Sequence, residues 1–398
     1  MPSTFDVIVV GLGAMGSAAC YQLAKRGCKV LGLDRFSPPH TFGSSHGQTR
    51  IIREAYFEHP LYVPLVQRAY ELWADLEREA GRRLLQQTGG LMIGRPEGVV
   101  FAGSKRSAEQ HKLAHEILSS SEVRRRFPAL QPDDEMAAVW EPRAGILFPE
   151  ACVESHLSLA KQHGALLGLD QPVVGWKPDG AGIVVQTTQG EYRANQIILS
   201  AGAWARSLLP ELALPLKVER QVLHWFDPTE EPHLFRAKNC PIYLWEYSEN
   251  HFFYGFPDLG EGVKVARHHE GEEADPNAVR REVAPDEVES MRDLVRRFLP
   301  KANGSLKSST VCLYTNTPDH HFLIGIHPEH PQVLIASPCS GHGFKFSSAI
   351  GELLADMVLE GRSRVDLSLF RLERCRSTEI PPGSPGVSGS PYSNERSR

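Results

Sequence analysis

FDVIVVGLGAMG, which spans residues 5–16, decides the fold class of this 398-residue chain. Its opening FDVIVV is an apolar, β-branched run that predicts a strand buried on both faces of a parallel sheet. Gly11 then allows a tight turn, Gly13 lets the backbone approach a pyrophosphate, and Gly16 lets a helix pack closely on the strand. The stretch therefore predicts a strand, a turn and a helix whose N-terminus faces bound phosphates.

A second strand and an acidic residue complete this unit. Gly27 ends the helix, and residues 29–33 predict a strand that runs into Asp34, eighteen positions after Gly16. An acidic side chain at that point can accept hydrogen bonds from ribose hydroxyls and disfavours the 2′-phosphate of NADP. The order of strand, turn, helix, strand and acid favours a dinucleotide site. The alternative is a glycine-rich turn that binds no ligand.

The composition limits the classes of protein to which this chain can belong. Hydrophobic residues make up 41% and charged residues 23%, as in ordinary soluble globular proteins, and the length suggests two or three domains at about 150 residues each. No apolar run reaches the roughly 18 residues that a membrane-spanning helix needs. The formal net charge of −5 lacks the basic excess expected of a nucleic-acid binder. We therefore expect neither a membrane nor a nucleic acid as a partner.

The seven cysteines are scattered, without a C-x-x-C pair. Neither a structural zinc site nor a disulfide framework is expected from this pattern, and the odd count fits a reducing compartment. Because a strand pattern begins at Phe5, there is no room for a secretory signal, and the mature protein is expected to start almost at Met1.

Later segments predict that the first sheet continues beside a second domain. Residues 192–201 and 332–336 have the pattern of buried strands, 242–256 is rich in β-forming residues, and 286–298 has the spacing of an amphipathic helix. We expect an α/β fold in which a Rossmann-like, glutathione-reductase-type domain is interleaved with an α+β substrate domain containing a mixed sheet, with the active site between them. The nucleotide-binding domain is expected to comprise residues 1–84, 150–215 and 320–376, and the substrate domain residues 85–149 and 216–319.

The C-terminal segment differs in composition from the rest of the chain. Its 22 residues, 377–398, include 13 that are Pro, Gly or Ser. Such a segment buries too little apolar surface to offset its ordering entropy, so we expect a disordered tail.

Two glycine-rich segments carry cations. Residues 43–53 (GSSHGQTRIIR) contain two arginines, whose planar forks suit a carboxylate, although a pair of surface salt bridges fits the composition equally well. Residues 340–345 (SGHGFK) lead into an amphipathic helix, where free N–H groups could stabilise negative charge on a reduced flavin ring. Lys345 would add a cation for the acid group of a substrate, or would be a solvated lysine.

At other positions, residue type alone does not decide between a structural and a functional role. Cys312 fits a small buried hydrophobic residue as well as a functional thiol. Lys264 lies in an alternating strand pattern, in which a lysine usually faces water, and the adjacent His268 and His269 are equally ambiguous.

Taken together, the motifs favour the functional interpretation of these residues over the structural one. From Phe5 to about Phe370 the chain resembles the family of monomeric sarcosine oxidases and pipecolate oxidases, which are amine-oxidising flavoproteins. The blocks that carry the resemblance are GLGAMG (11–16), GSSHGQTRIIR (43–53), YGFPDLGEGVKVARHH (254–269), CLYTNTPDHHFLIG (312–325) and SGHGFKFSS (340–348). Four of the five lie outside the general nucleotide fingerprint.

The resemblance implies a covalently bound FAD. Cys312 would carry a thioether to the 8α-methyl group of the flavin, an 8α-S-cysteinyl link. The residues implied in holding the adenosine half are Gly11, Gly13, Gly16 and Asp34. Other implied cofactor contacts are Ser44, Val174 on the adenine side, Gly341, Gly343 and Lys345.

The resemblance also implies roles around the substrate. Arg53 and Lys345 match the positions that bind the substrate carboxylate. The pocket lining would include Tyr254, His268 and Tyr314. The groups placed near flavin N5 are Thr49, Arg50 and Lys264. The cation of Lys264 would assist oxygen reduction, because a fixed ammonium stabilises superoxide-like negative charge.

The implied reaction is oxidation of a secondary amino acid such as sarcosine, L-pipecolate or a related N-alkyl amino acid. It yields an imine and, from oxygen, hydrogen peroxide, with the redox chemistry supplied by the cofactor. Two alternatives stay open: a nicotinamide-dependent dehydrogenase on the same nucleotide unit, and a flavoprotein subunit without oxidase activity that holds a partner. A missing catalytic position would favour the second alternative, and none is missing.

The remaining expectations concern Arg267, assembly and compartment. Arg267 stands where an aromatic residue is common in the family; it could add positive charge at the pocket mouth, or face solvent. We expect a monomer whose partners are a small amino acid and oxygen. Animal pipecolate oxidases of the family resemble peroxisomal enzymes with a Ser-Lys-Leu-like terminus, whereas this chain ends NERSR (394–398). The cytoplasm is therefore expected, with the peroxisome as the alternative.

Overall fold

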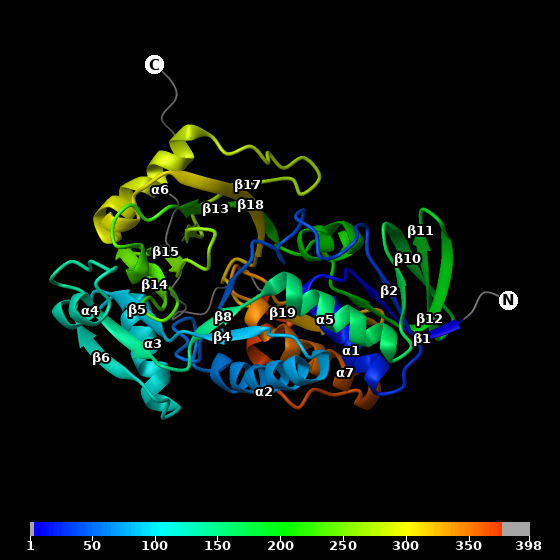
Figure 1. Cartoon of the computed structure of the whole chain (residues 1–398). Coiled ribbons are helices and arrows are strands. Elements are labelled where there is room, and N and C mark those ends of the chain that lie inside the picture. The colour runs from blue at the N-terminus through cyan, green and yellow to red at the C-terminus, as the bar shows by residue number, and fades with distance from the viewer. Residues whose placement is uncertain (1–3, 376–398) are drawn as a thin grey trace, which may run out of the picture.

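The computed structural model describes residues 4–375 and contains one predominantly parallel sheet (Figure 1). Strands β20, β12, β1, β2 and β9 run parallel in that order, β10 and β11 extend β12 antiparallel, and β19 pairs antiparallel with β20. The strands of this eight-stranded sheet are β1 (Thr4–Val10), β2 (Val30–Leu33), β9 (Leu166–Gly168), β10 (Val173–Asp179), β11 (Gly182–Thr187), β12 (Gly190–Leu199), β19 (Leu323–Ile326) and β20 (Val333–Ser337).

Helices pack beside this sheet. Helix α1 (Ala14–Lys25) contacts both α5 (Pro149–Gln162) and α7 (Ser347–Glu360), and α2 (Tyr62–Ala80) packs against α7 (Figure 1). The crossing of α1 and α7 is close, because a Cβ atom at Gly351 would lie 2.6 Å from the Cβ of Ala18. Within residues 4–375 none of the helices has the length and apolar character needed to cross a bilayer.

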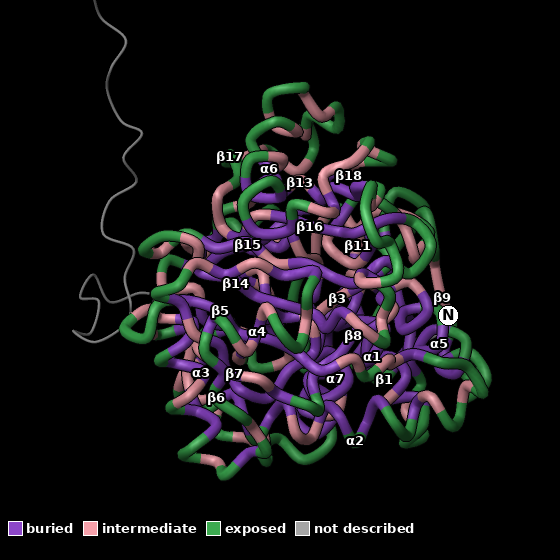
Figure 2. The backbone as a smooth tube through the Cα atoms, turned by 60° about the vertical axis from the view of Figure 1, so that its left-hand side comes forward, coloured by how far each residue is buried: buried purple, intermediate pink, exposed green. Residues whose placement is uncertain are grey.

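A nine-stranded mixed sheet forms the second half of the structure. Strands β17, β13, β16, β15, β14, β5, β7 and β6 lie in that order, with β18 on β13, and only the β14–β5 pairing is parallel. These strands are β5 (Gly90–Gly94), β6 (Glu116–Ser119), β7 (Ala137–Glu141), β13 (Lys217–Phe226), β14 (Ile242–Ser248), β15 (His251–Phe256), β16 (Val263–His268), β17 (Glu272–Glu273) and β18 (Leu306–Asn316). The inner strands of this sheet are largely buried (Figure 2).

Helices pack on both faces of the mixed sheet. Helix α6 (Pro285–Phe298) packs on β13 and β16, and its Met291, Leu294, Val295 and Phe298 are buried. Helices α3 (Val99–Gln110) and α4 (Ser120–Arg126) lie against β5, β6 and β7. A small antiparallel sheet of β3 (Arg50–Ile52), β8 (Gly145–Leu147) and β4 (Leu85–Gln87) joins segments far apart in the chain.

The α/β architecture with a mixed second sheet confirms the predicted fold class. Every strand of the eight-stranded sheet falls within 1–84, 150–215 or 320–376, and every strand of the nine-stranded sheet within 85–149 or 216–319. The small sheet pairs β3 of the first group with β4 and β8 of the second. We propose these five ranges as the domains, with the small sheet at their junction. The expected tail, 377–398, lies outside the described residues.

Candidate active site

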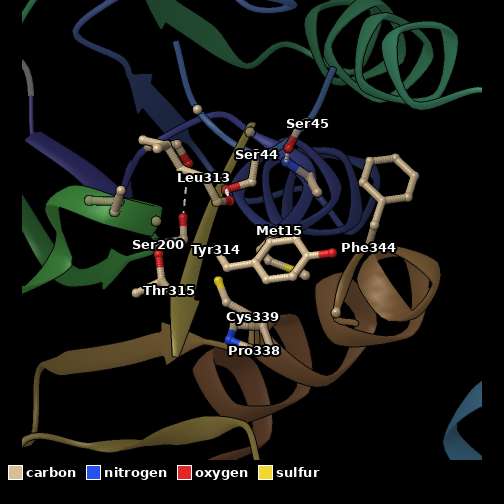
Figure 3. A pocket seen from close by; sticks show the side chains of 18 of the residues that line it. Met15, Ser44, Ser45, Ser200, Leu313, Tyr314, Thr315, Pro338, Cys339 and Phe344 are labelled. Carbon is tan, nitrogen blue, oxygen red and sulfur yellow. Dashed lines mark hydrogen bonds between the residues drawn. The ribbon is translucent and has the colours of Figure 1, made fainter. Parts of the chain in front are cut away.

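One cavity lies between the two large sheets. The carboxyl ends of the parallel strands reach it through Val10, Leu33 and Ser200, and the mixed sheet faces it through Tyr254 and His268. Figure 3 shows further lining side chains: Met15 from α1, Ser44 and Ser45 from the loop after β2, Tyr314 and Thr315 from β18, and Cys339 and Phe344 from the segment before α7. Ligands of open α/β sheets bind at such strand ends.

The glycine turn forms one end of the cavity. Gly11 has φ +87°, a left-handed conformation that favours glycine. Gly13 lines the cavity, whereas Gly16 lies behind it: a Cβ atom at Gly16 would stand 1.8 Å from the Gly11 carbonyl oxygen. The turn therefore brings the start of α1 against the end of β1, as the glycine pattern predicts.

Asp34 closes the turn from the neighbouring strand. Its Oδ2 accepts a hydrogen bond from the Leu12 N–H at 2.6 Å, and its Oδ1 accepts one from the Phe36 N–H at 2.9 Å. Burial raises the pKa of this carboxyl, while the two N–H donors oppose that shift. Val174, 64% exposed, lines the same end of the cavity from β10. The predicted dinucleotide residues thus surround one end of the cavity.

Two buried cations line the cavity as well. Arg53 is 3% exposed and Lys345 is 5% exposed. The Lys345 ammonium donates to the His342 carbonyl at 2.6 Å and to the Tyr56 hydroxyl at 3.3 Å, while Arg53 bonds to Glu58. Burial, followed by repulsion from Arg53, lowers the pKa of Lys345 to about 7. This pair of cations beside one internal carboxylate can take up a further anion.

Three polar side chains lie on the mixed-sheet side. His268 Nδ1 lies 3.1 Å from the Tyr314 hydroxyl, and the ring of Tyr254 stands edge-on to His268 at 6.1 Å. Burial, and next the neighbouring His269, hold the pKa of His268 well below its ordinary value. A neutral imidazole at this point can accept or donate a hydrogen bond to a ligand.

Cys312 lies in the middle of β18 rather than at a strand end, and it is 2% exposed. Its Sγ lines the cavity and accepts a hydrogen bond from Arg50 Nη2 at 3.4 Å. Arg50 also donates to the Ser44 carbonyl at 2.6 Å, and Ser44 Oγ donates to the Leu313 carbonyl at 2.5 Å. The sulfur is therefore fixed beside the Arg50 guanidinium.

Two predicted site residues lie behind the cavity wall. Lys264 is 2% exposed and donates to the Thr49 carbonyl and hydroxyl oxygens, both at 3.0 Å. The usual expectation that a strand lysine faces water is wrong here, because β16 is an inner strand and Lys264 shares the face that carries His268. Neither Lys264 nor Thr49 lines the cavity; Arg50 separates them from it on the Cys312 side.

Arg267 points away from the cavity. It lies on the opposite face of β16, donates to Glu270 Oε2 at 2.6 Å and bonds to Ser290 of α6. The idea of extra positive charge at the pocket mouth is therefore wrong, since strand alternation places neighbouring side chains on opposite faces. Gly341 and Gly343, in contrast, line the cavity.

Several lining residues escaped the sequence analysis. Glu58, Leu244, Phe256 and His342 line the cavity, and Tyr56 bonds to His342 Nδ1 at 2.6 Å. The only sequence signal for Glu58 is its position five residues after Arg53. Phe256 and His342 lie inside the motif blocks 254–269 and 340–348 but were not singled out. Leu244 carries no local signal, because apolar strand residues occur in any core.

Comparison with known proteins identifies the group to which this site belongs. A family profile described as FAD dependent oxidoreductase matches residues 6–357. The chain belongs to this family. It is 45% identical over 374 residues to a monomeric sarcosine oxidase of Streptomyces avermitilis, covering 93% of this chain and 97% of that protein. It is 36% identical over 375 residues to an N-methyl-L-tryptophan oxidase of Yersinia pestis, covering 94% and 100%.

Solved structures share the fold of this FAD-dependent oxidoreductase. NikD, an amino acid oxidase of nikkomycin biosynthesis, superimposes with a TM-score of 0.81 at 24% identity, covering 93% of this chain and 97% of its own. The L-proline dehydrogenase of P. horikoshii gives 0.82 at 21% identity, covering 94% and 98%. The predicted resemblance to sarcosine oxidases is confirmed, and the relatives favour it over the nicotinamide-dependent alternative.

The cavity of this FAD-dependent oxidoreductase fits its cofactor on structural grounds. Thr315 lines the cavity, and its buried Oγ1 has no hydrogen-bond partner. A Cβ atom at Gly341 would lie 2.6 Å from the Tyr314 ring, so this backbone approaches the cavity as closely as glycine allows. FAD would lie with its adenosine half at Gly11, Gly13 and Asp34 and its flavin near Cys312.

Proposed function

We propose that this chain is an FAD-dependent oxidase of secondary amino acids that carry one carboxylate. The observation that supports this most is the pair of buried cations, Arg53 and Lys345, on the cavity that the glycine turn opens. Two buried cations next to one internal carboxylate leave one positive charge for a ligand anion. Sarcosine, L-pipecolate and N-methylated larger amino acids share this chemistry, and relatives named for sarcosine and N-methyl-L-tryptophan support the class.

The proposed reaction removes two electrons and two hydrogens from the amine nitrogen and the carbon beside it. Bound FAD supplies the two-electron acceptor, oxygen is finally reduced to hydrogen peroxide, and water hydrolyses the resulting imine. Arg53 and Lys345 bind the carboxylate and so direct the reacting carbon. The neutral imidazole of His268, held by Tyr314, offers a hydrogen-bonding partner to the amine, and Tyr254 lines the same wall. Only the free-base amine donates electrons, so turnover rises with pH.

Cys312 is the proposed site of covalent attachment. The Arg50 guanidinium lies beside its sulfur, which would bond to the 8α-carbon of FAD. Overall the thiol and the methyl group each lose one hydrogen, and the two electrons released reduce oxygen to hydrogen peroxide. The product is a thioether that fixes the flavin in the cavity.

A monomer in the cytoplasm is the proposed state of the enzyme. The relatives at highest identity here are named monomeric sarcosine oxidases, and six of the seven cysteines, those whose side chains the structure describes, are free. Free thiols fit a reducing compartment.

A substrate panel tests the proposal. The purified full chain is mixed anaerobically with sarcosine, L-pipecolate, N-methyl-L-tryptophan and the matching primary amino acids, and flavin absorbance is followed. We expect bleaching by secondary amino acids, with peroxide formed in equal amount once oxygen is admitted. A protein without flavin absorbance, or a flavin that no secondary amino acid bleaches, would contradict the proposal.

A further inference from the structure

The Lys264 ammonium is enclosed by a turn from the other domain. Nζ donates to the Gly47 carbonyl at 2.6 Å and to the Thr49 carbonyl and hydroxyl at 3.0 Å. The rings of Phe256 and Trp225 lie 4.7 and 5.3 Å from it. An ammonium has three protons, and the turn offers three acceptors. The backbone conformation of residues 47–49 therefore determines where the charge sits.

This turn has an unusual backbone. Gly47 has φ +94° and Gln48 has φ +68°, and a left-handed conformation at a residue other than glycine costs about 1 kcal/mol. A Cβ atom at Gly47 would lie 2.7 Å from Leu223 Cδ1 and 3.7 Å from Lys264 Nζ. The turn is thus closely packed and costly to form, so other groups must hold it.

Glu150 holds it. Oε1 of Glu150 accepts hydrogen bonds from the Gly47 N–H at 2.7 Å and the Gln48 N–H at 3.0 Å. Glu150 lies in the first turn of α5, where the helix dipole favours a carboxylate, and α5 packs on α1. From the opposite side the Trp225 indole donates to Gln48 Oε1 at 3.1 Å. The carboxylate therefore connects a helix of the nucleotide-binding half to the acceptors of Lys264.

The negative charge of Glu150 favours the protonated form of Lys264, in addition to the hydrogen bonds by which Glu150 holds the turn. Burial, and next repulsion from Arg50, hold the pKa of Lys264 well below its ordinary value, while Cys312 and Glu150 raise it. The buried imidazole of His46 also faces this ammonium. A thioether at Cys312 carries no charge, so with flavin attached Glu150 is the remaining anion of this set.

We propose that Glu150 is the positioning residue for Lys264: it fixes the turn at residues 47–49 and keeps the ammonium in place and charged for the reaction with oxygen. The inference rests on the proposed oxidase function and on the role that the resemblance implies for Lys264, whose cation would assist oxygen reduction. It assigns Glu150 to the oxygen half of the reaction and not to substrate oxidation, since the residue contacts neither the cation pair nor the substrate wall.

The test separates the two half-reactions in the flavin-loaded full chain. Stopped-flow measurements give the rate of flavin reduction by substrate without oxygen and the rate at which reduced protein reacts with oxygen. Glu150→Gln should lower the oxygen rate about tenfold near neutral pH and move its pH dependence to lower pH, with substrate reduction within about twofold. Glu150→Ala should lower the oxygen rate further.

Two controls tie the effect to Lys264. Glu154→Gln, one turn along α5 and paired with Arg82 at the surface, should leave both rates unchanged. In a Lys264→Met background, Glu150→Gln should have no further effect on the oxygen rate, because the group it positions is gone. A crystal structure of Glu150→Ala should show Lys264 Nζ displaced from the Gly47 carbonyl, a readout independent of activity.

An oxygen rate unchanged in Glu150→Gln and Glu150→Ala overturns the proposal. So does an equal fall in both half-reactions, or loss of flavin, which would make Glu150 a general support of the fold. Because dithionite can reduce the flavin without substrate, the oxygen rate is measurable even if no secondary amino acid is oxidised. Failure of the proposed function and failure of this inference are therefore distinguishable.

Discussion

One guanidinium nitrogen of Arg53, Nη2, lies 2.8 Å from both carboxylate oxygens of Glu58, in an ion pair whose side chains are 3% and 11% exposed. Both residues line the main cavity. The internal carboxylate therefore occupies the part of the arginine fork that a substrate carboxylate would use. A ligand must compete with Glu58, and the strength of this pair sets part of the substrate affinity.

Removing the charge of Glu58 should tighten substrate binding. In Glu58→Gln the amide binds Arg53 less strongly than a carboxylate does, so we expect the KM for a secondary amino acid to fall about tenfold. Steady-state kinetics measures this, with Glu71→Gln on the exposed face of α2 as the control. A KM that rises in Glu58→Gln would instead mean that the carboxylate holds Arg53 in its working orientation.

Binding of carboxylates should weaken above neutral pH. The free enzyme holds Lys345 with a pKa of about 7, so the ammonium that attracts an anion is lost as pH rises through that value. For a competitive carboxylate without an amine, the Kd should rise by up to about tenfold per pH unit above pH 7. Flavin absorbance titrations between pH 6 and 9 measure it.

Lys345→Arg is the matched variant for this titration, because a guanidinium stays charged throughout the range. Its Kd should be nearly independent of pH. A wild-type Kd that is equally flat would contradict the assignment of this titration to Lys345.

Cys312→Ser should abolish covalent attachment and leave binding. A serine hydroxyl is not ionised beside Arg50 at neutral pH, so no bond to the flavin forms. After acid precipitation we expect yellow colour in the supernatant of Cys312→Ser and in the pellet of the wild type. Cys339→Ser is the control, since that thiol also lines the cavity. Flavin released from the wild type would contradict the proposed thioether.

Glu141 should make the stability of the protein depend on pH. Its side chain is 1% exposed and accepts hydrogen bonds from the N–H groups of Glu54 and Ala55, and burial raises its pKa to about 7 despite these donors. The folded state therefore binds this proton more tightly than the unfolded state does. Its contribution to stability is full below the unfolded pKa and is lost as pH rises through about 7.

The size of this effect follows from the shift in pKa. Glu141→Gln stays neutral, so relative to the wild type it should gain about 3 kcal/mol in the free energy of unfolding between pH 4 and pH 8. Urea denaturation of both proteins across this range measures the difference. Parallel stability curves would show that the Glu141 carboxyl has an ordinary pKa in the folded protein.

Part of the fold could be predicted from local patterns. The glycine stretch predicted β1, α1 and β2 in order, and the predicted helix over 286–298 is α6, Pro285–Phe298. These elements follow from contacts between residues close in sequence: a strand period, a turn that needs glycine, and an apolar helix face. The pairing order of the nine-stranded sheet could not be predicted, because its partners lie far apart in the chain: Gly90 pairs with Ile242.

The candidate site also has a part that the sequence predicted and a part that only the tertiary structure decided. The sequence by itself determined which residue types are present at the motif positions, including Arg53, Cys312 and Lys345, since those motifs are contiguous. Only the tertiary structure decided that Lys264 is buried and that Glu150 reaches its turn. The ammonium of residue 264 and its acceptors at 47–49 are more than two hundred positions apart, and a carboxylate from a third segment connects them. Such an arrangement depends on how α5 and β16 pack around one turn, and no spacing along the chain encodes it.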